Sequence, residues 1–333
     1  MDSTLHYLLL PLSLFGIIAI EAMGLQLILG GAGLLTLGHT AFFAIGGYAS
    51  ATFVTYIAPA LGFQNPALLL IFGTLFAIFL SGASSFLVAI PCLRLRGDYL
   101  AVATMGFGQI IENILYNIPQ LGGASGFTNI PHLASLWLIW IMVTVTGCGL
   151  YRFYQTGIGQ AILCSRDDEI VARCFGMSPE KSKMAAFIVG NMVTGLAGAL
   201  YVHTFQFISP VSAGFQKSVE ILLAVVIGGM FSIWGSLLGA AILVLVPELL
   251  RFLPHHLSGG LEFLVSTGLL SSRISHLMMD FFQNSMLIFS LIVLLILKVN
   301  PAGANSLLHS FHQSLKRTLK IRTRGEQANE AAS

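Results

Sequence analysis

Ser165-Arg166-Asp167-Asp168-Glu169-Ile170-Val171-Ala172-Arg173-Cys174-Phe175-Gly176 lies within a long polar interval, Tyr151 to Met184, between two blocks of apolar sequence. Ser165 can cap the first free amides of a helix, and Asp168, three residues later, can reach back in a capping box. Three consecutive acidic residues then occupy the positive end of the helix dipole. Gly176 can end the helix by adopting the left-handed conformation. The pattern predicts a short helix over residues 166–175.

One face of this predicted helix is apolar. Ile170, Val171, Cys174 and Phe175 recur at helical spacing, and ten residues of helix are about 15 Å long. Such a helix at a membrane surface indicates a docking element for a partner protein. The alternative is an ordinary solvated loop helix, which would expose its apolar face without a purpose. Ser178-Pro179 predicts the start of the next helix.

The composition is that of an integral membrane protein. Of the 333 residues, 56% are hydrophobic and only 9% are charged, and the mean hydropathy is +0.85. Several apolar runs reach the roughly 20 residues needed to cross a bilayer as a helix, too many for a signal peptide to explain. The sequence therefore predicts an all-α, polytopic helical bundle embedded in the lipid bilayer.

We expect nine spans, at 6–29, 39–57, 67–91, 99–116, 133–151, 184–205, 217–231, 237–253 (ended by Pro254) and 284–297. The glycine-rich break at 30–38 indicates either close helix packing or a hinge or pore-lining bend. Span 99–116 is rich in small and polar residues, which is typical of a helix buried in the bundle. Residues 1–305 form the expected transmembrane domain, with a cytoplasmic loop at 152–183, and 306–333 a basic, partly disordered cytoplasmic tail.

The positive charges predict the orientation. With nine spans, one face of the membrane holds thirteen of the sixteen Lys and Arg residues and the other face holds three. Cytoplasmic loops carry the excess of positive charge. The amino terminus is therefore expected outside the cell and the carboxyl terminus in the cytoplasm.

The sequence lacks several kinds of site. It contains no Gly-x-x-x-x-Gly-Lys-Ser/Thr loop, so any energy from ATP must come from another chain. Neither a hydrolytic set nor metal-ligand spacing is present, His39 and His203 are isolated, and the four cysteines are not arranged as a framework. We expect no cofactor, no metal, no nucleic-acid partner and no enzymatic activity. Four carboxylates lie within or near spans, either as pathway groups or as protonated or hydrogen-bonded side chains: Glu21, Glu112, Glu220 and Glu248.

Several motifs, taken in order, resemble the permeases of bacterial branched-chain amino acid ABC transporters, and most closely the M-type permease. They span roughly residues 24–250 and read Arg94-Leu95-Arg96-Gly97-Asp98-Tyr99, Gly106-Phe107-Gly108-Gln109, Gly122-Gly123-Ala124-Ser125-Gly126, Arg166-Asp167-Asp168-Glu169, Gly195-Leu196-Ala197-Gly198, Ile208-Ser209-Pro210 and Gly228-Gly229-Met230-Phe231. In the family, an Ala-Ala-x-x-x-Gly motif in a cytoplasmic loop couples the permease to the ATPase, and it maps here to Val171, Ala172 and Gly176. The match departs from the family where Val171 replaces the first alanine of this motif, and after Val299, where the family's Arg-Pro-x-Gly-Leu ending is missing. Residues 254–283 and the tail match no motif of the family.

The resemblance implies a permease paired with a second, related permease chain in the bacterial inner membrane, two ATP-hydrolysing subunits in the cytoplasm, and an amino-acid-binding protein outside. The residues expected to couple to the ATPase are Arg166, Asp168, Glu169, Ile170, Val171, Ala172, Phe175 and Gly176. The residues expected to line the pore are His39, Thr104, Gln109, Glu112 and Asn191.

The expected function is import of leucine, isoleucine and valine by alternating access, driven by ATP hydrolysed in the partner subunits. Two alternatives stay open. Importers of urea and short amides have related permeases, and an ion-coupled secondary carrier would need no ATPase. No stretch of the sequence reads as a pocket for one particular cargo.

Overall fold

The structure is a computed structural model that describes residues 2–266, except 61, 63–64 and 96, together with the single positions 290, 294 and 298. The described residues are predominantly helical, and their only strand-like feature is one antiparallel bridge between Phe127 and Ile208. Six helices in this part of the chain are long and apolar enough to cross a membrane. The predicted all-α membrane bundle is confirmed.

Eleven α-helices and five short helical segments follow one another in the described part of the chain. The first half contains α1 (Asp2–Gln26), the π-helical turn η1 (Leu27–Gly31), α2 (His39–Thr52), η2 (Phe53–Ile57), α3 (Ala58–Ala60), α4 (Pro66–Cys92), α5 (Asp98–Tyr116), η3 (Pro119–Leu121) and η4 (Gly123–Ser125). The second half contains α6 (Leu136–Gln155), α7 (Gly157–Asp167), α8 (Glu169–Cys174), α9 (Pro179–Phe205), η5 (Pro210–Ala213), α10 (Phe215–Gly228) and α11 (Ile233–Ser266).

The expected spans agree with these helices in order, with differences at their ends. α10 has 14 residues, or about 21 Å of helix, less than the roughly 30 Å of a bilayer core. Pro254 does not end the eighth span, because α11 continues to Ser266. A proline inside a helix removes one backbone hydrogen bond and disfavours the helix, but the helix runs through Pro254 here. The ninth span, apart from the single positions given above, and the tail lie outside the described residues.

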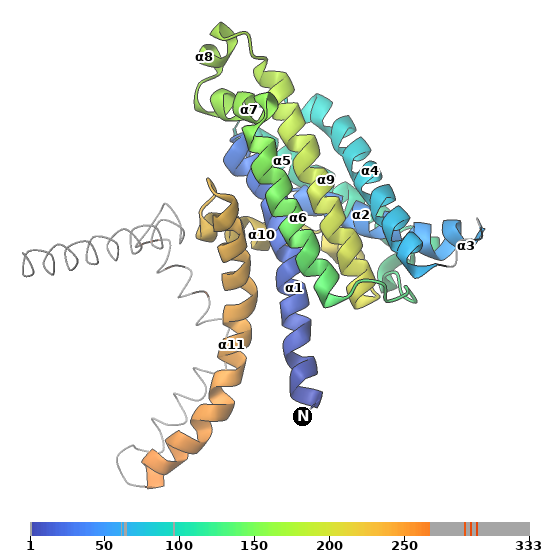
Figure 1. The fold of residues 1–333 in the computed structure, drawn as a ribbon, viewed down its shortest axis with the longest axis vertical. Coiled ribbons are helices and arrows are strands. Elements are labelled where there is room, and N and C mark those ends of the chain that lie inside the picture. Colours follow the sequence, from blue (N-terminus) through green and yellow to red (C-terminus); the bar gives the residue numbers. More distant parts are fainter. Residues whose placement is uncertain are drawn as a thin grey trace, which may run out of the picture.

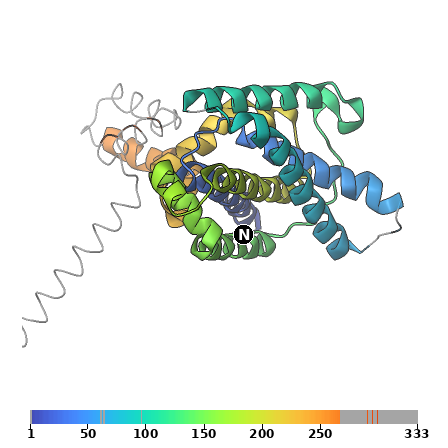
Figure 2. The same ribbon diagram turned by 90° about the horizontal axis from the view of Figure 1, so that it is seen from above.

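Helix α9 lies at the centre of the bundle, where it packs against α1, α2 and α4 (Figures 1 and 2). Its glycines allow backbones to touch. A Cβ atom at Gly198 would lie 2.0 Å from the carbonyl oxygen of Phe43, and one at Gly195 would lie 2.5 Å from the Cβ of Ser81. In lipid there is no hydrophobic driving force between helices, so their association depends on the close van der Waals packing that small residues allow. The helices α1, α2, α4 and α9 therefore form one close-packed block.

The glycine-rich break between α1 and α2 is also closely packed. A Cβ atom at Gly30 would lie 1.6 Å from the carbonyl oxygen of Met230, and one at Gly38 would lie 1.9 Å from that of Thr104. The backbone amide of Leu37 donates to Thr104 Oγ1 at 3.2 Å. Of the two interpretations of this break, close packing is the one that these contacts favour.

Helices α7 and α8 lie at one end of the molecule, and the amino terminus of α1 lies at the other (Figure 1). The chain reaches α7 from α6 and leaves α8 into α9. The polar interval of the sequence therefore connects two long helices of the bundle at the end remote from the amino terminus.

Candidate functional site: the α7–α8 elbow

The predicted helix 166–175 is wrong, because the chain breaks it at Asp168. This residue has an extended backbone (φ −155°, ψ 116°) that ends α7 and starts α8. Its Oδ1 atom accepts the backbone amides of Ile170 at 2.7 Å and Val171 at 3.2 Å. Ser165, the expected cap, is a buried residue inside α7. Asp168 is as strong a capping residue as serine, so the true cap lies three residues later than predicted.

Gly176 ends α8 as predicted. Its φ is +75°, its amide donates to the carbonyl of Arg173 at 3.0 Å, and the Met177 amide donates to the carbonyl of Ala172 at 3.0 Å. This pair of bonds is the Schellman arrangement, which a glycine at this position favours. No atom lies within 4 Å of a Cβ built at Gly176, so only the backbone conformation restricts the residue type here.

One side of α8, together with Phe175 directly after it, presents an apolar surface away from the bundle. Ile170 and Phe175 are each 73% exposed and Val171 is 44% exposed, whereas Ala172 is fully buried against the protein. Cys174 is exposed as well. The face that the sequence places together is thus accessible at the tip of the molecule, on a helix of about 9 Å rather than 15 Å.

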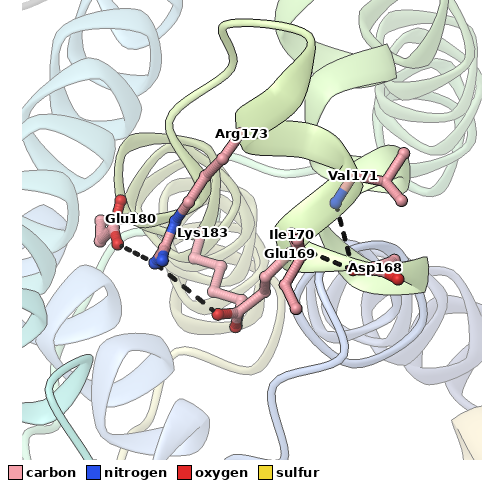
Figure 3. A network of polar contacts seen from close by, with 7 residues as sticks. All are labelled: Asp168, Glu169, Ile170, Val171, Arg173, Glu180 and Lys183. Atoms are coloured by element: carbon pink, nitrogen blue, oxygen red, sulfur yellow. Dashed lines mark hydrogen bonds and ion pairs between the residues drawn. The ribbon is translucent and has the colours of Figure 1, made fainter.

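Ion pairs fasten the other side of α8 to the first turns of α9 (Figure 3). Arg173 Nη2 lies 2.7 Å from Glu180 Oε1 and 4.0 Å from Glu169 Oε2, and Lys183 Nζ pairs with Glu169 Oε1. These side chains are a quarter to about two thirds exposed, so each pair contributes only about 0–1 kcal/mol. Together they fix the orientation of α8 on α9. Sequence reasoning missed Lys183, whose (i, i+14) spacing to Glu169 gives no local signal.

Arg166 points into the protein and not toward the exposed surface of α8. Its Nη1 donates to the carbonyl oxygen of Gly30 at 2.8 Å, and its guanidinium lies 5.1 Å from the ring centre of Phe231. Asp167 accepts from its Nε at 2.8 Å. The structure therefore separates Arg166 from Ile170 and Phe175, with which the sequence groups it.

The five expected pore residues do not form one group. His39 is the buried first residue of α2. Thr104 of α5 is buried against the loop that precedes α2, where it accepts the Leu37 amide. Asn191 is fully buried between α4 and α9, where its side-chain amide donates to Ser85 Oγ at 3.0 Å. Gln109 is exposed on α5 and donates to Glu112 Oε2 at 3.1 Å. Only Gln109 and Glu112 of the five reach the outside of the described chain.

Helix α5 was expected inside the bundle, and half of it is exposed. Its outer stripe combines apolar and polar residues at helical spacing: Tyr99, Val102, Gly106, Gln109, Asn113 and Asn117. The amides of Asn113 and Asn117 bond back to carbonyls one turn earlier, at 2.9 and 2.7 Å. Amide side chains in a membrane normally face protein or a water-filled cavity. The stripe is therefore a face that lipid does not cover well.

The other carboxylates lie apart from this stripe. Glu21 in α1 is fully buried, and Glu248 in α11 is partly buried. Lys217 Nζ and Glu220 Oε2 are 3.0 Å apart. Among the residues that the structure describes, no three His, Cys, Asp or Glu side chains are grouped as metal ligands.

A family model described as the permease component of the branched-chain amino acid transport system matches residues 7–297. The chain belongs to this family. It is a multi-pass membrane protein of the M type, since it is 33% identical over 267 residues to the high-affinity permease protein LivM of Salmonella typhimurium. The aligned region covers 70% of this chain and 61% of that relative. The LivM protein of Escherichia coli K12 gives the same identity and coverage.

The LivH permease of Salmonella typhimurium is less similar, at 22% identity over 244 residues, which covers 68% of this chain and 79% of the relative. No solved structure matches the chain. The resemblance to M-type permeases that the motifs indicate is confirmed, and the match accounts for about three fifths of the length of the LivM relatives.

Proposed function

We propose that this chain is one of two permease subunits of an ATP-binding-cassette importer that carries leucine, isoleucine and valine across the inner membrane. Its partners are a second, related permease chain, two ATP-hydrolysing subunits in the cytoplasm and an amino-acid-binding protein on the outer side. The relatives named for high-affinity branched-chain amino acid transport support the cargo.

The observation that carries this proposal is the exposed apolar tip of α8. Ile170 and Phe175 are each 73% exposed on a short helix that is capped at both ends and fastened to α9 by ion pairs. Apolar faces of helices insert into apolar grooves of partner proteins. We assign this tip to a groove on the ATPase subunit, with Val171 at its border and Asp168 and Gly176 holding its ends.

The exposed stripe of α5 supports the second permease chain as a partner. Gln109, Asn113 and Asn117 carry polar groups on a span that, in a lone chain, would meet hydrocarbon. We propose that this stripe faces the transport pathway between the two permease chains, where water and the cargo's charged groups bind the donors and acceptors that the helix itself leaves free. Gly106, around which no atom lies within 4 Å of a built Cβ, leaves space on the same face.

The proposed orientation places α7 and α8 in the cytoplasm and the amino terminus outside. Thirteen of the sixteen Lys and Arg residues fall on the α7–α8 side when nine spans are counted. This arrangement presents α8 to soluble ATPase subunits, which have access only to the cytoplasmic face.

The test is uptake by the assembled complex. The chain is co-expressed with a second permease of the family, two ATPase subunits and a binding protein, and the complex is reconstituted into liposomes. We expect uptake of radiolabelled leucine that requires internal ATP and persists when ionophores dissipate all ion gradients. Uptake of urea but not leucine would favour the short-amide importer. Uptake that needs no ATP and that ionophores abolish would favour the secondary carrier.

A further inference from the structure

Arg166 joins three elements that are distant in the sequence. It belongs to the last turn of α7, its Nη1 binds the carbonyl of Gly30 at the end of η1, and its guanidinium covers the ring of Phe231 in the turn between α10 and α11. The carbonyls at the end of a helix lack helical partners and carry its negative dipole. Arginine is better suited than lysine to this position, because its planar guanidinium can donate to such a carbonyl and lie over an aromatic ring at the same time.

A second layer of contacts ties the same elements together. Gln26 of α1 donates through Nε2 to the carbonyl of Met230 at 3.2 Å, and Tyr154 of α6 donates to Gln26 Oε1 at 3.2 Å. Gly30 lies so close to Met230 that a Cβ atom would sit 1.6 Å from its carbonyl oxygen. The end of α1 and the α10–α11 turn therefore pack as one unit, and Arg166 connects that unit to the elbow that carries α8.

The side chain of Arg166 is only 24% exposed, which leaves little of it for a partner protein. Asp167, which bonds its Nε, orients the guanidinium from the solvent side. Ile170 and Phe175, on the far side of the Asp168 break, are the residues that reach outward.

We propose that Arg166 is a positioning residue that transmits movement of α7 and α8 to the end of α1 and to the α10–α11 turn. This inference rests on the proposed function, in which an ATPase moves α8. When α8 is displaced, α7 carries Arg166 with it, and the bond to Gly30 and the stacking on Phe231 pull the ends of α1, α10 and α11 in the same direction. Without Arg166, the ATPase still docks and hydrolyses ATP, but the spans do not follow.

The experiment uses the full complex in nanodiscs, with a reporter cysteine at Ser232 in a chain whose four native cysteines are replaced by alanine. Ser232 lies in the α10–α11 turn, next to Phe231. The maleimide labelling rate is measured without nucleotide and after trapping with ATP and vanadate. We expect the nucleotide to change the rate in the parent complex and the change to disappear in Arg166→Gln, while ATPase association persists.

Transport is measured on the same variants without the reporter. We expect leucine uptake per ATP hydrolysed to fall about tenfold in Arg166→Gln, within the range usual for loss of a coupling interaction, and less in Arg166→Lys, which keeps the charge but loses the stacking. Phe231→Leu, which leaves the bond to Gly30, is expected to lie between Arg166→Lys and the parent. Arg152→Gln, at an exposed position near the end of α6, is the matched control and should behave as the parent.

Two results would overturn the inference: a nucleotide response of the reporter that survives Arg166→Gln, or loss of ATPase association in that variant, which would make Arg166 a docking residue. If Arg166→Gln fails to insert, Arg166→Lys and Phe231→Leu decide by the same readouts. A complex that takes up no leucine but whose reporter response depends on Arg166 would refute the cargo and leave this inference standing.

Discussion

A substitution at Gly176 changes the backbone energy without creating a steric clash, because the residue has φ +75° and open space where a side chain would point. A β-branched residue in the left-handed region costs about 1–2 kcal/mol. We therefore expect Gly176→Val to fray the end of α8 and to weaken ATPase association in pull-down assays, with normal abundance in the membrane. Gly176→Asn should be milder, since asparagine tolerates this conformation. Equal association of all three proteins would show that the helix stop does not matter for docking.

Gly30 presents the opposite situation, in which space and not conformation restricts the residue. Gly30→Ala would place a methyl group 1.6 Å from the carbonyl of Met230, and overpacking typically costs about 1–3 kcal/mol. We expect a lower apparent melting temperature of the detergent-solubilised protein. Gly106→Ala is the matched control, because no atom lies within 4 Å of a Cβ built there; it should melt at the parent's temperature or slightly above, since alanine favours a helix more than glycine.

Local sequence predicted the residue that ends α8 but not the residue that begins it. Ser165 and Asp168 are both good capping residues, and nothing local distinguishes them. The choice is made by tertiary packing, which buries Ser165 within α7. The inward direction of Arg166 was equally invisible, since its partners Gly30 and Phe231 are 136 and 65 positions away and come together only in the folded bundle.

At the scale of single elements, the apolar tip of α8 yields a direct prediction. Ile170→Asp combined with Phe175→Asp places two charges on the surface assigned to the ATPase groove, where they would be desolvated without partners. We expect the permease pair to assemble in the membrane, the ATPase to be lost on purification and uptake to fall to background. Ile170→Val with Phe175→Leu keeps the surface apolar and is the control that should retain both. An ATPase that co-purifies with the double aspartate variant and still drives uptake would move the docking surface elsewhere.

The order of the helices could be predicted from the apolar runs, whereas the environment of each helix could not. The sequence of α5 predicted burial because glycine and amide residues suit a crowded bundle, yet its outer stripe from Tyr99 to Asn117 is exposed. The composition of a helix indicates that one of its faces does not contact lipid. It does not indicate whether that face is covered by the same chain or by another chain. α11 likewise continues past Pro254, although a proline disfavours a helix locally.

For the whole molecule, the orientation can be tested by cysteine labelling from the two sides of the membrane. Gln160→Cys in α7 should react with an impermeant maleimide only from the cytoplasm, and Ser125→Cys, in the loop between α5 and α6, only from outside. Both positions are exposed, so a failure of either cysteine to react from one side could not be attributed to burial within the protein. Reaction of both from the same side would refute the charge-based orientation.

The glycines along α9 also limit how this sequence can change over evolutionary time. At Gly190, Gly195 and Gly198 the neighbouring atoms lie within 2.7 Å of any added Cβ, so no single substitution is accommodated unless a facing helix shifts as well. Neutral drift in the family should therefore be concentrated on the outward-facing residues of α4 and α6, such as Phe79 and Trp137, where one apolar side chain can replace another in lipid. The helices nearest the centre would keep their sequence longest, although few of their side chains take part in chemistry.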